Sequence, residues 1–110
     1  MKGTFLGEFE EVVLLATCVL DKNAYANLVK DEVEKHTDRN INLSAIHSSL
    51  YRLEKKGFLS SELGEASQKR GGKRKRIFKP TPYGLQAVQQ IKEIRESLWN
   101  NMPQTLFQNS

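Results

Sequence analysis

A short basic segment in the second half of the chain carries its clearest potential for chemistry. The stretch "KRGGKRKRIFK", from Lys69 to Lys79, has seven Lys or Arg residues, no Asp or Glu, and two adjacent glycines. Ammonium and guanidinium groups bind phosphates, so this cluster favours a polyanionic partner, with nucleic acid ahead of a membrane surface. The alternatives are a solvated loop and a localisation signal. Because the helix start "PTPYGLQAV" follows closely, we expect the segment to belong to the folded unit.

The positive charge is unevenly distributed along the chain. The 110 residues have a net charge of +4, yet residues 1–64 contain 8 Lys and Arg against 10 Asp and Glu. Residues 65–110 contain 9 against 3, so the two parts carry −2 and +6. The length suits one small domain with a modest core. We therefore expect one basic patch on an otherwise mixed surface.

Residues typical of catalysis or metal binding do not form a recognisable set. His36 and His47 fall on different predicted helices, and no carboxylate, histidine and nucleophile converge by spacing. A single cysteine, Cys18, excludes a disulfide within one chain and argues against structural zinc. The stretch "RGGKRKR" lacks the glycine and Lys-Ser/Thr spacing of a nucleotide-binding loop. We therefore expect no enzyme activity, no metal and no cofactor.

Cys18 lies in the apolar run "VVLLATCVL". Nine residues are too few to span a bilayer, and the acidic residues before them differ from the basic leader of a signal peptide. We therefore expect a cytoplasmic protein. In it Cys18 is a small buried apolar residue or, alternatively, a redox switch.

Three helices are predicted in the first half of the chain, over residues 5–20, 24–37 and 43–56. The apolar side of the third helix is formed by Ile46, Leu50 and Leu53. Asn42 or Ser44 can cap its start, and Gly57 is typical of its end. The opposite face is polar and rich in hydrogen-bond donors. It carries His47, Ser48, Tyr51, Arg52 and Lys55.

The second half of the chain predicts a β-hairpin followed by one long helix. The extended runs "FLSSEL" and "KRIFKP" flank the basic segment, and Gly71-Gly72 suits a tight turn. Thr81 and Pro82 then indicate a helix start. An apolar stripe at three- and four-residue spacing follows, formed by Leu85, Val88, Ile91, Ile94, Leu98 and Met102, with Trp99 beside it. This order predicts a mainly α fold, a winged helix-turn-helix plus a C-terminal dimerisation helix, whose third helix enters the major groove.

Two segments, "LSAIHSSLYRLEKKGFL" and "GGKRKRIFKPTPYG", resemble the PadR family of bacterial transcription regulators, in its compact branch with one short C-terminal helix. The likeness covers roughly residues 5–99. Its matching positions are Arg52, Leu53, Glu54, Gly57, Gly71, Gly72, Phe78, Thr81 and Gly84. The family usually has tyrosine at the positions of His47 and Phe78, and an apolar residue at that of Pro80. The resemblance implies a homodimer held by the C-terminal helix, a palindromic operator and, often, release by a small-molecule inducer.

These arguments predict two functional surfaces. The predicted DNA-binding residues are Ser44, His47, Ser48, Tyr51, Arg52, Lys69, Arg70, Gly71, Gly72, Lys73, Arg74, Lys75 and Arg76. The predicted dimer interface is formed by Leu85, Val88, Ile91, Ile94, Leu98, Trp99 and Met102. Alternatively, His47 is a surface residue without a role, Arg52 pairs with Glu8, Glu10 or Glu11, and the stripe packs only within its own domain. Trp99 is interface core or the floor of a pocket for a flat aromatic effector.

We expect residues 1–80 to form the DNA-binding domain, residues 81–103 the dimerisation helix and residues 104–110 a flexible tail. The function expected is that of a sequence-specific, dimeric transcription regulator, a repressor released by a small-molecule effector. The alternative is an interaction module that binds protein or structured RNA through its basic wing. The donor-rich face of the third helix favours the regulator, because a protein-binding face would more often be apolar.

Overall fold

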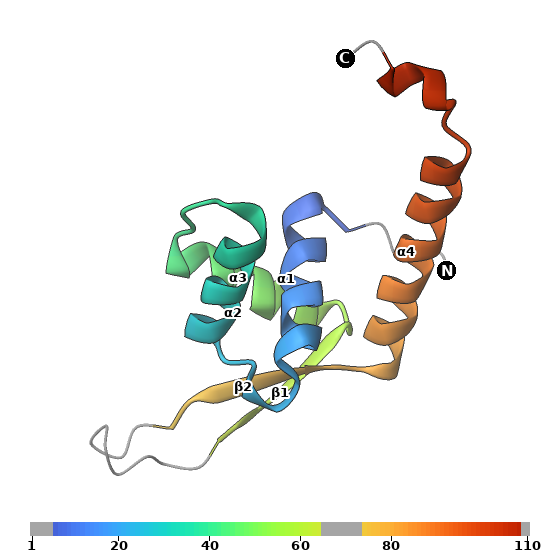
Figure 1. The fold of residues 1–110 in the computed structure, drawn as a ribbon. Coiled ribbons are helices and arrows are strands. Elements are labelled where there is room, and N and C mark those ends of the chain that lie inside the picture. The colour runs from blue at the N-terminus through green and yellow to red at the C-terminus, as the bar shows by residue number, and fades with distance from the viewer. Residues whose placement is uncertain (1–5, 65–73, 109–110) are drawn as a thin grey trace.

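The computed structural model describes residues 6–64 and 74–108, which form a three-helix unit and a hairpin with a longer helix beside them (Figure 1). The elements are α1 (Glu8–Leu20), η1 (Asp21–Asn23), α2 (Ala26–Thr37), α3 (Leu43–Lys55), β1 (Leu59–Leu63), β2 (Arg76–Pro80), α4 (Pro82–Asn100) and η3 (Gln104–Phe107). The order of helices and hairpin is the predicted one. The first helix begins at Glu8 rather than Phe5, which lies outside the described residues.

Local sequence signals account for the ends of the helices. The side chain of Asn42 accepts a hydrogen bond from the Ser44 amide at 2.8 Å, so Asn42 and not Ser44 caps α3. Thr81 caps α4 in the same way, with Pro82 as the first helical residue. The first turn of α1 contains Glu8, Glu10 and Glu11. Negative charge at this end of a helix interacts favourably with the helix dipole.

The hydrophobic core lies between α1, α2, α3 and the hairpin. Its largest fully buried side chains belong to Phe58, Phe78, Leu14, Ile46, Leu50, Leu53 and Leu59. The predicted apolar side of α3 is therefore confirmed. Phe78 also anchors β2, because its amide donates to the carbonyl of Ala24 at 2.8 Å and so ties the strand to the turn before α2.

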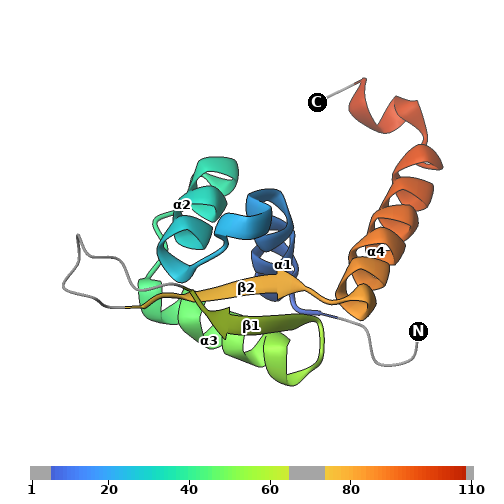
Figure 2. The same ribbon diagram turned by 90° about the horizontal axis from the view of Figure 1, so that it is seen from below.

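The hairpin is antiparallel, and its register pairs Leu59 with Pro80 and Leu63 with Arg76. Figure 2 shows β1 alongside α3, with α4 leaving from the end of β2. This arrangement of three helices and a two-stranded wing is a winged helix-turn-helix, as predicted. The predicted Gly71-Gly72 turn lies outside the described residues.

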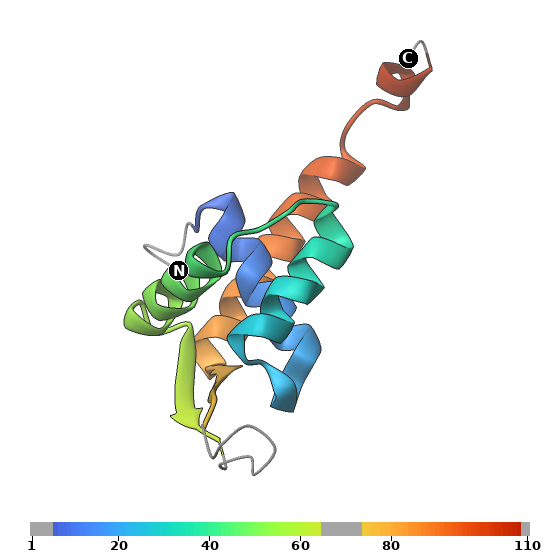
Figure 3. The same ribbon diagram turned by 90° about the vertical axis from the view of Figure 1, so that its left-hand side faces the viewer.

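Helix α4 stands beside α1 and extends well past the three-helix unit (Figure 1 and Figure 3). Its first turn is fixed to the turn between α3 and β1. The Thr81 hydroxyl donates to the Gly57 carbonyl at 2.6 Å, and the Thr81 amide donates to the Phe58 carbonyl at 3.1 Å. Gly84 packs so closely on Phe58 that a Cβ atom there would collide with the Phe58 carbonyl.

The chain after α4 contains one more short helix. The helix ends at Asn100, so Met102 lies beyond it, and Gln104–Phe107 then form a short 3-10 helix. The Phe107 ring lies 5.8 Å from the Trp99 ring, measured between centroids. This contact between two aromatic side chains packs the short helix against the end of α4. The polar residues around Phe107 in the sequence did not indicate such packing.

Candidate nucleic-acid interface

The polar face of α3 is exposed along its length. Ser44, His47, Ser48, Tyr51 and Arg52 all point away from the core. Because Ile46, Leu50 and Leu53 are fully buried on the other side, the helix cannot rotate without exposing the core. The structure therefore presents the predicted α3 residues together as one continuous surface of hydroxyl, imidazole, phenol and guanidinium groups.

Tyr51 is supported from two sides. Its ring stacks on that of His47 at a centroid distance of 6.3 Å and meets the buried ring of Phe78 edge-on at 5.8 Å. Tyr51 nevertheless remains 50% exposed. An aromatic residue held in this way loses little further conformational entropy on binding. The contact between Tyr51 and Phe78 joins the α3 surface to the wing.

Three described cations, which lie at the start of β2 or just before it, each have an intramolecular partner. Arg74 donates from Nε to the Gly64 carbonyl at 2.8 Å, and Lys75 Nζ lies 3.8 Å from the centre of the Tyr25 ring. Arg76 donates from Nη1 to the Ser61 hydroxyl at 3.0 Å. The other predicted wing residues, Lys69, Arg70, Gly71, Gly72 and Lys73, lie outside the described residues.

A cleft of about 340 Å³ connects these groups. It opens between the start of α2, the exposed face of α3 and residues 74–78 of the wing. Its walls include Tyr25, Asn27, His47, Tyr51 and Arg74. The walls combine aromatic rings, an amide and positive charge. Such a surface matches a sugar-phosphate backbone, which offers oxygen acceptors and carries negative charge.

The C-terminal end of α3 is held to α1 by a buried carboxylate. The Glu10 side chain is 9% exposed, and its two oxygens lie 3.0 and 3.1 Å from Lys56 Nζ. Arg52 Nη1 lies 3.8 Å from the same carboxylate, so the alternative that Arg52 pairs with an acidic residue of the first helix is confirmed. Sequence reasoning missed Lys56 because the pair joins residues 46 positions apart.

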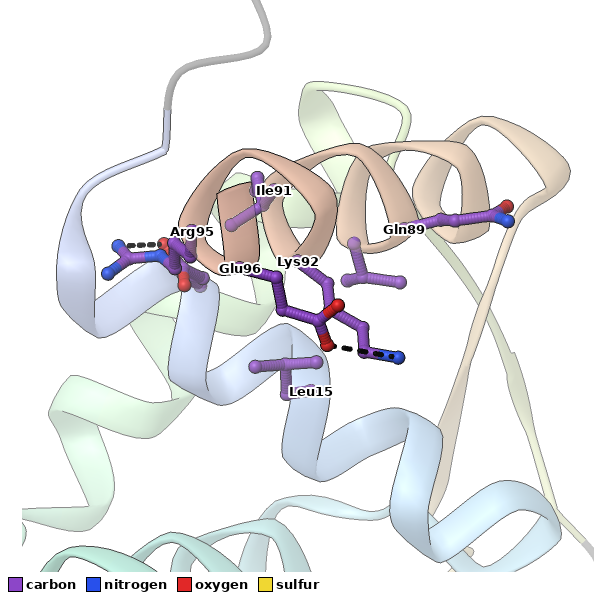
Figure 4. Close-up of a pocket in the computed structure, with 8 residues that line it drawn as sticks. Leu15, Gln89, Ile91, Lys92, Arg95 and Glu96 are labelled. Atoms are coloured by element: carbon purple, nitrogen blue, oxygen red, sulfur yellow. Dashed lines mark hydrogen bonds and ion pairs between the residues drawn. The ribbon is translucent and has the colours of Figure 1, made fainter. Parts of the chain in front are cut away.

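A second surface runs along α4. Leu85, Ile94, Leu98 and Trp99 of the predicted stripe are exposed, whereas Val88, Ile91 and Met102 are partly buried. A groove of about 440 Å³ separates α4 from α1, with Leu15, Val88 and Ile91 on its apolar walls (Figure 4). An ion pair between Arg95 and Glu11 at 2.9 Å joins the two helices across this groove. Near the end of the helix lies a hollow of about 350 Å³, which is lined by Trp99, Asn100, Met102, Gln104 and Phe107.

Residues 6–64 and 74–108 contain no group of His, Cys, Asp and Glu that could hold a metal ion. Within the same ranges, no helix combines the length and apolar character needed to cross a membrane. Cys18 is half-buried, and burial raises the pKa of its thiol, which lowers the thiolate fraction.

The fold and the α3–wing surface define the class of winged-helix proteins, with an added long helix. No family model matches the chain, and no curated protein matches it. Solved structures with this fold include a PadR family transcription regulator from Clostridium difficile, with 20% identity and a TM-score of 0.70 over 87% of this chain and 97% of that one.

Two further structures agree with this likeness. A PadR-like transcriptional regulator from Bacillus cereus has 20% identity and a TM-score of 0.68, with 91% of each chain covered. A PadR family regulator from Eggerthella lenta has 21% identity and a TM-score of 0.69 over 94% of this chain and 88% of that one. The chain therefore has the fold of PadR-like regulators.

Proposed function

We propose that this protein is a PadR-like transcription regulator that binds double-stranded DNA. The observation that carries the proposal is the surface on which the polar face of α3 and the wing cations Arg74 and Lys75 border one cleft. In this arrangement α3 enters the major groove, and its Ser48, Tyr51 and His47 side chains face the base edges. The wing, including Lys69, Arg70, Lys73 and Arg74, contacts the flanking phosphates.

We further propose that the protein acts as a homodimer on a palindromic operator in the cytoplasm. Residues 1–80 read the DNA, and α4 with the residues up to 103 holds the two protomers together. The exposed side chains of Leu85, Ile94 and Leu98 support this, because a stripe of this size favours burial against a second apolar surface. Occupation of the operator would repress transcription.

Release by a small planar aromatic effector completes the proposal. Its support is the hollow that Trp99, which is 63% exposed, lines together with Met102 and Phe107. An aromatic compound could stack on the indole there. Trp99 is the only tryptophan of the chain, so its fluorescence would report such binding directly.

The first test measures affinity for a fluorescent random-sequence duplex at several salt concentrations. Lys73→Ala with Arg74→Ala should weaken binding and flatten the log–log salt dependence by about 0.9 for each phosphate that the wing no longer neutralises. Lys35→Ala with Lys92→Ala is the matched control, because it removes the same charge from exposed sites on α2 and α4, outside the proposed surface.

The wing assignment is contradicted if both double variants flatten the salt dependence equally, since net charge alone would then explain the loss. An RNA hairpin and a single-stranded RNA of equal length are measured in parallel. Preference for either RNA over the duplex would instead favour the alternative of an RNA-binding module.

A further inference from the structure

Three polar side chains link α3 to both strands of the wing. The Ser61 hydroxyl of β1 donates to Glu54 Oε2 of α3 at 2.6 Å. The same hydroxyl oxygen accepts from Nη1 of Arg76, in β2, at 3.0 Å. All three residues are partly buried. We call this set the Glu54–Ser61–Arg76 relay.

The register of the hairpin explains how the relay is possible. Ser61 pairs with Phe78 and Leu63 with Arg76, so Arg76 is the diagonal neighbour of Ser61. Cross-strand partners share a face of the sheet, and a long side chain can reach a diagonal neighbour. Since Phe78 is buried against the core, Ser61 and Arg76 lie on the face turned toward the helices, where Glu54 can reach them.

The chemistry of the relay makes it directional. A serine hydroxyl has one proton to donate, which goes to the carboxylate, and its lone pairs accept from the guanidinium. Both contacts are charge-assisted and therefore stronger than neutral hydrogen bonds, and each polarises the other. Through Ser61 the relay connects the guanidinium of Arg76 to Glu54, which is the acidic residue of α3.

We propose that the relay fixes the angle between the wing and α3, so that Arg76 and Ser61 are positioning residues rather than DNA contacts. This inference rests on the proposed function, in which α3 and the wing contact one duplex together. Arg76 thus positions the wing, whereas Lys69, Arg70, Lys73 and Arg74 are the residues proposed to contact phosphates. Removal of any member would let the wing swing relative to α3, and the wing would then meet fewer phosphates.

The test compares Ser61→Ala and Arg76→Ala, alone and together, in the full-length protein on the same duplex. Each single variant should lower affinity about three- to tenfold and reduce the salt slope. The double variant should be no weaker than the weaker single one, because both remove the same relay. If Arg76 instead contacted phosphate directly, the two effects would multiply, and that result would overturn the inference.

Two further variants separate positioning from general stability. Ser60 is one residue away on the opposite face of β1, paired with Lys79, so Ser60→Ala should leave affinity and salt slope unchanged. Ser61→Thr keeps the hydroxyl and should restore both. Equal reductions in affinity for Ser60→Ala and Ser61→Ala would contradict the relay.

A measurement without DNA keeps this inference distinct from the proposed function. Residual dipolar couplings of the amides in β1, β2 and α3 report the orientation of the wing relative to the helix. Ser61→Ala should shift or average the couplings of the hairpin, while Ser60→Ala should not. Unchanged couplings in Ser61→Ala refute the relay even where the duplex is bound, and failure of the wild-type protein to bind duplex refutes the proposed function instead.

Discussion

At the scale of single residues, Gly84 shows how tightly α4 is joined to the rest of the domain. Its backbone lies against the carbonyl of Phe58, and a Cβ atom would also come within 3.0 Å of the carbonyl carbon. These atoms belong to the backbone and cannot rotate away. The missing side chain is therefore a requirement of the packing, in a helix where alanine would otherwise be favoured.

We predict that Gly84→Ala lowers the free energy of unfolding by about 1–3 kcal/mol or more, the usual effect of overpacking, despite the better helix propensity of alanine. Urea denaturation followed by circular dichroism measures the change. Gln86→Ala, at an exposed position two residues along the same helix, is the control and should be nearly neutral. A stabilising effect of Gly84→Ala would mean that α4 can shift away from Phe58 easily.

Residue periodicity predicted which side chains of α3 face solvent, because burial of Ile46, Leu50 and Leu53 leaves only one orientation for the helix. It did not predict their partners. The contacts of Tyr51 with Phe78, Lys75 with Tyr25 and Lys56 with Glu10 join segments that are far apart in the chain. Such pairs depend on how the elements pack in three dimensions, and no local pattern encodes them.

At the scale of elements, the loop between α2 and α3 is fixed by one carboxylate. Glu34, in α2, accepts a hydrogen bond from the Ile41 amide at 2.9 Å and pairs with Lys30 at 3.2 Å. The Ile41 amide first, and Lys30 second, lower the pKa of this carboxyl below its ordinary value. The ionised form therefore stabilises the approach to α3.

A carboxyl whose pKa is lowered by folding stabilises the protein above its unfolded pKa of about 4.3, and this contribution is lost as the pH falls through the folded value. We predict that Glu34→Gln lowers the melting temperature at pH 7. The difference from wild type should shrink as the pH falls below about 4. Asp31→Asn, an exposed position on the same helix, serves as control. A difference that is constant with pH would exclude the ionised carboxylate as its cause.

Helix caps and turn residues made the elements themselves predictable: Asn42, Thr81 and Pro82 place helix starts where the structure has them. The short helix at residues 104–107 was not predictable, since "QTLF" has no periodic pattern at that length. Its Phe107 lies against Trp99, and that contact exists only because α4 ends where it does.

At the scale of the whole molecule, the chain is elongated, with extents of 58 × 32 × 20 Å. Much of this length comes from α4, which continues past the core and leaves Leu98 68% exposed. The core unit is too short to cover this helix. The groove between α1 and α4, with its apolar walls and charged rim, lies next to the exposed stripe.

We predict that the wild-type protein is a dimer at micromolar concentration. Leu98→Asp should make it monomeric, because a charge buried in an apolar contact must be desolvated. Sedimentation equilibrium measures the association. Ser97→Asp adds the same charge at an adjacent exposed residue and should remain dimeric. A wild-type protein that stays monomeric while binding duplex DNA tightly would rule out the proposed assembly.

The contacts of Thr81 and Gly84 with Gly57 and Phe58 fix the start of α4 to the end of α3. The end of α3 and the start of α4 meet at Gly57 and Phe58. A rotation of α4 would therefore move α3 in the same direction. In the proposed dimer joined through α4, a small change in the crossing angle of the two α4 helices would move the two α3 helices through a larger distance. An effector beside Trp99 would contact the end of α4 directly, so its effect would reach α3 through α4 and would need no path through the core.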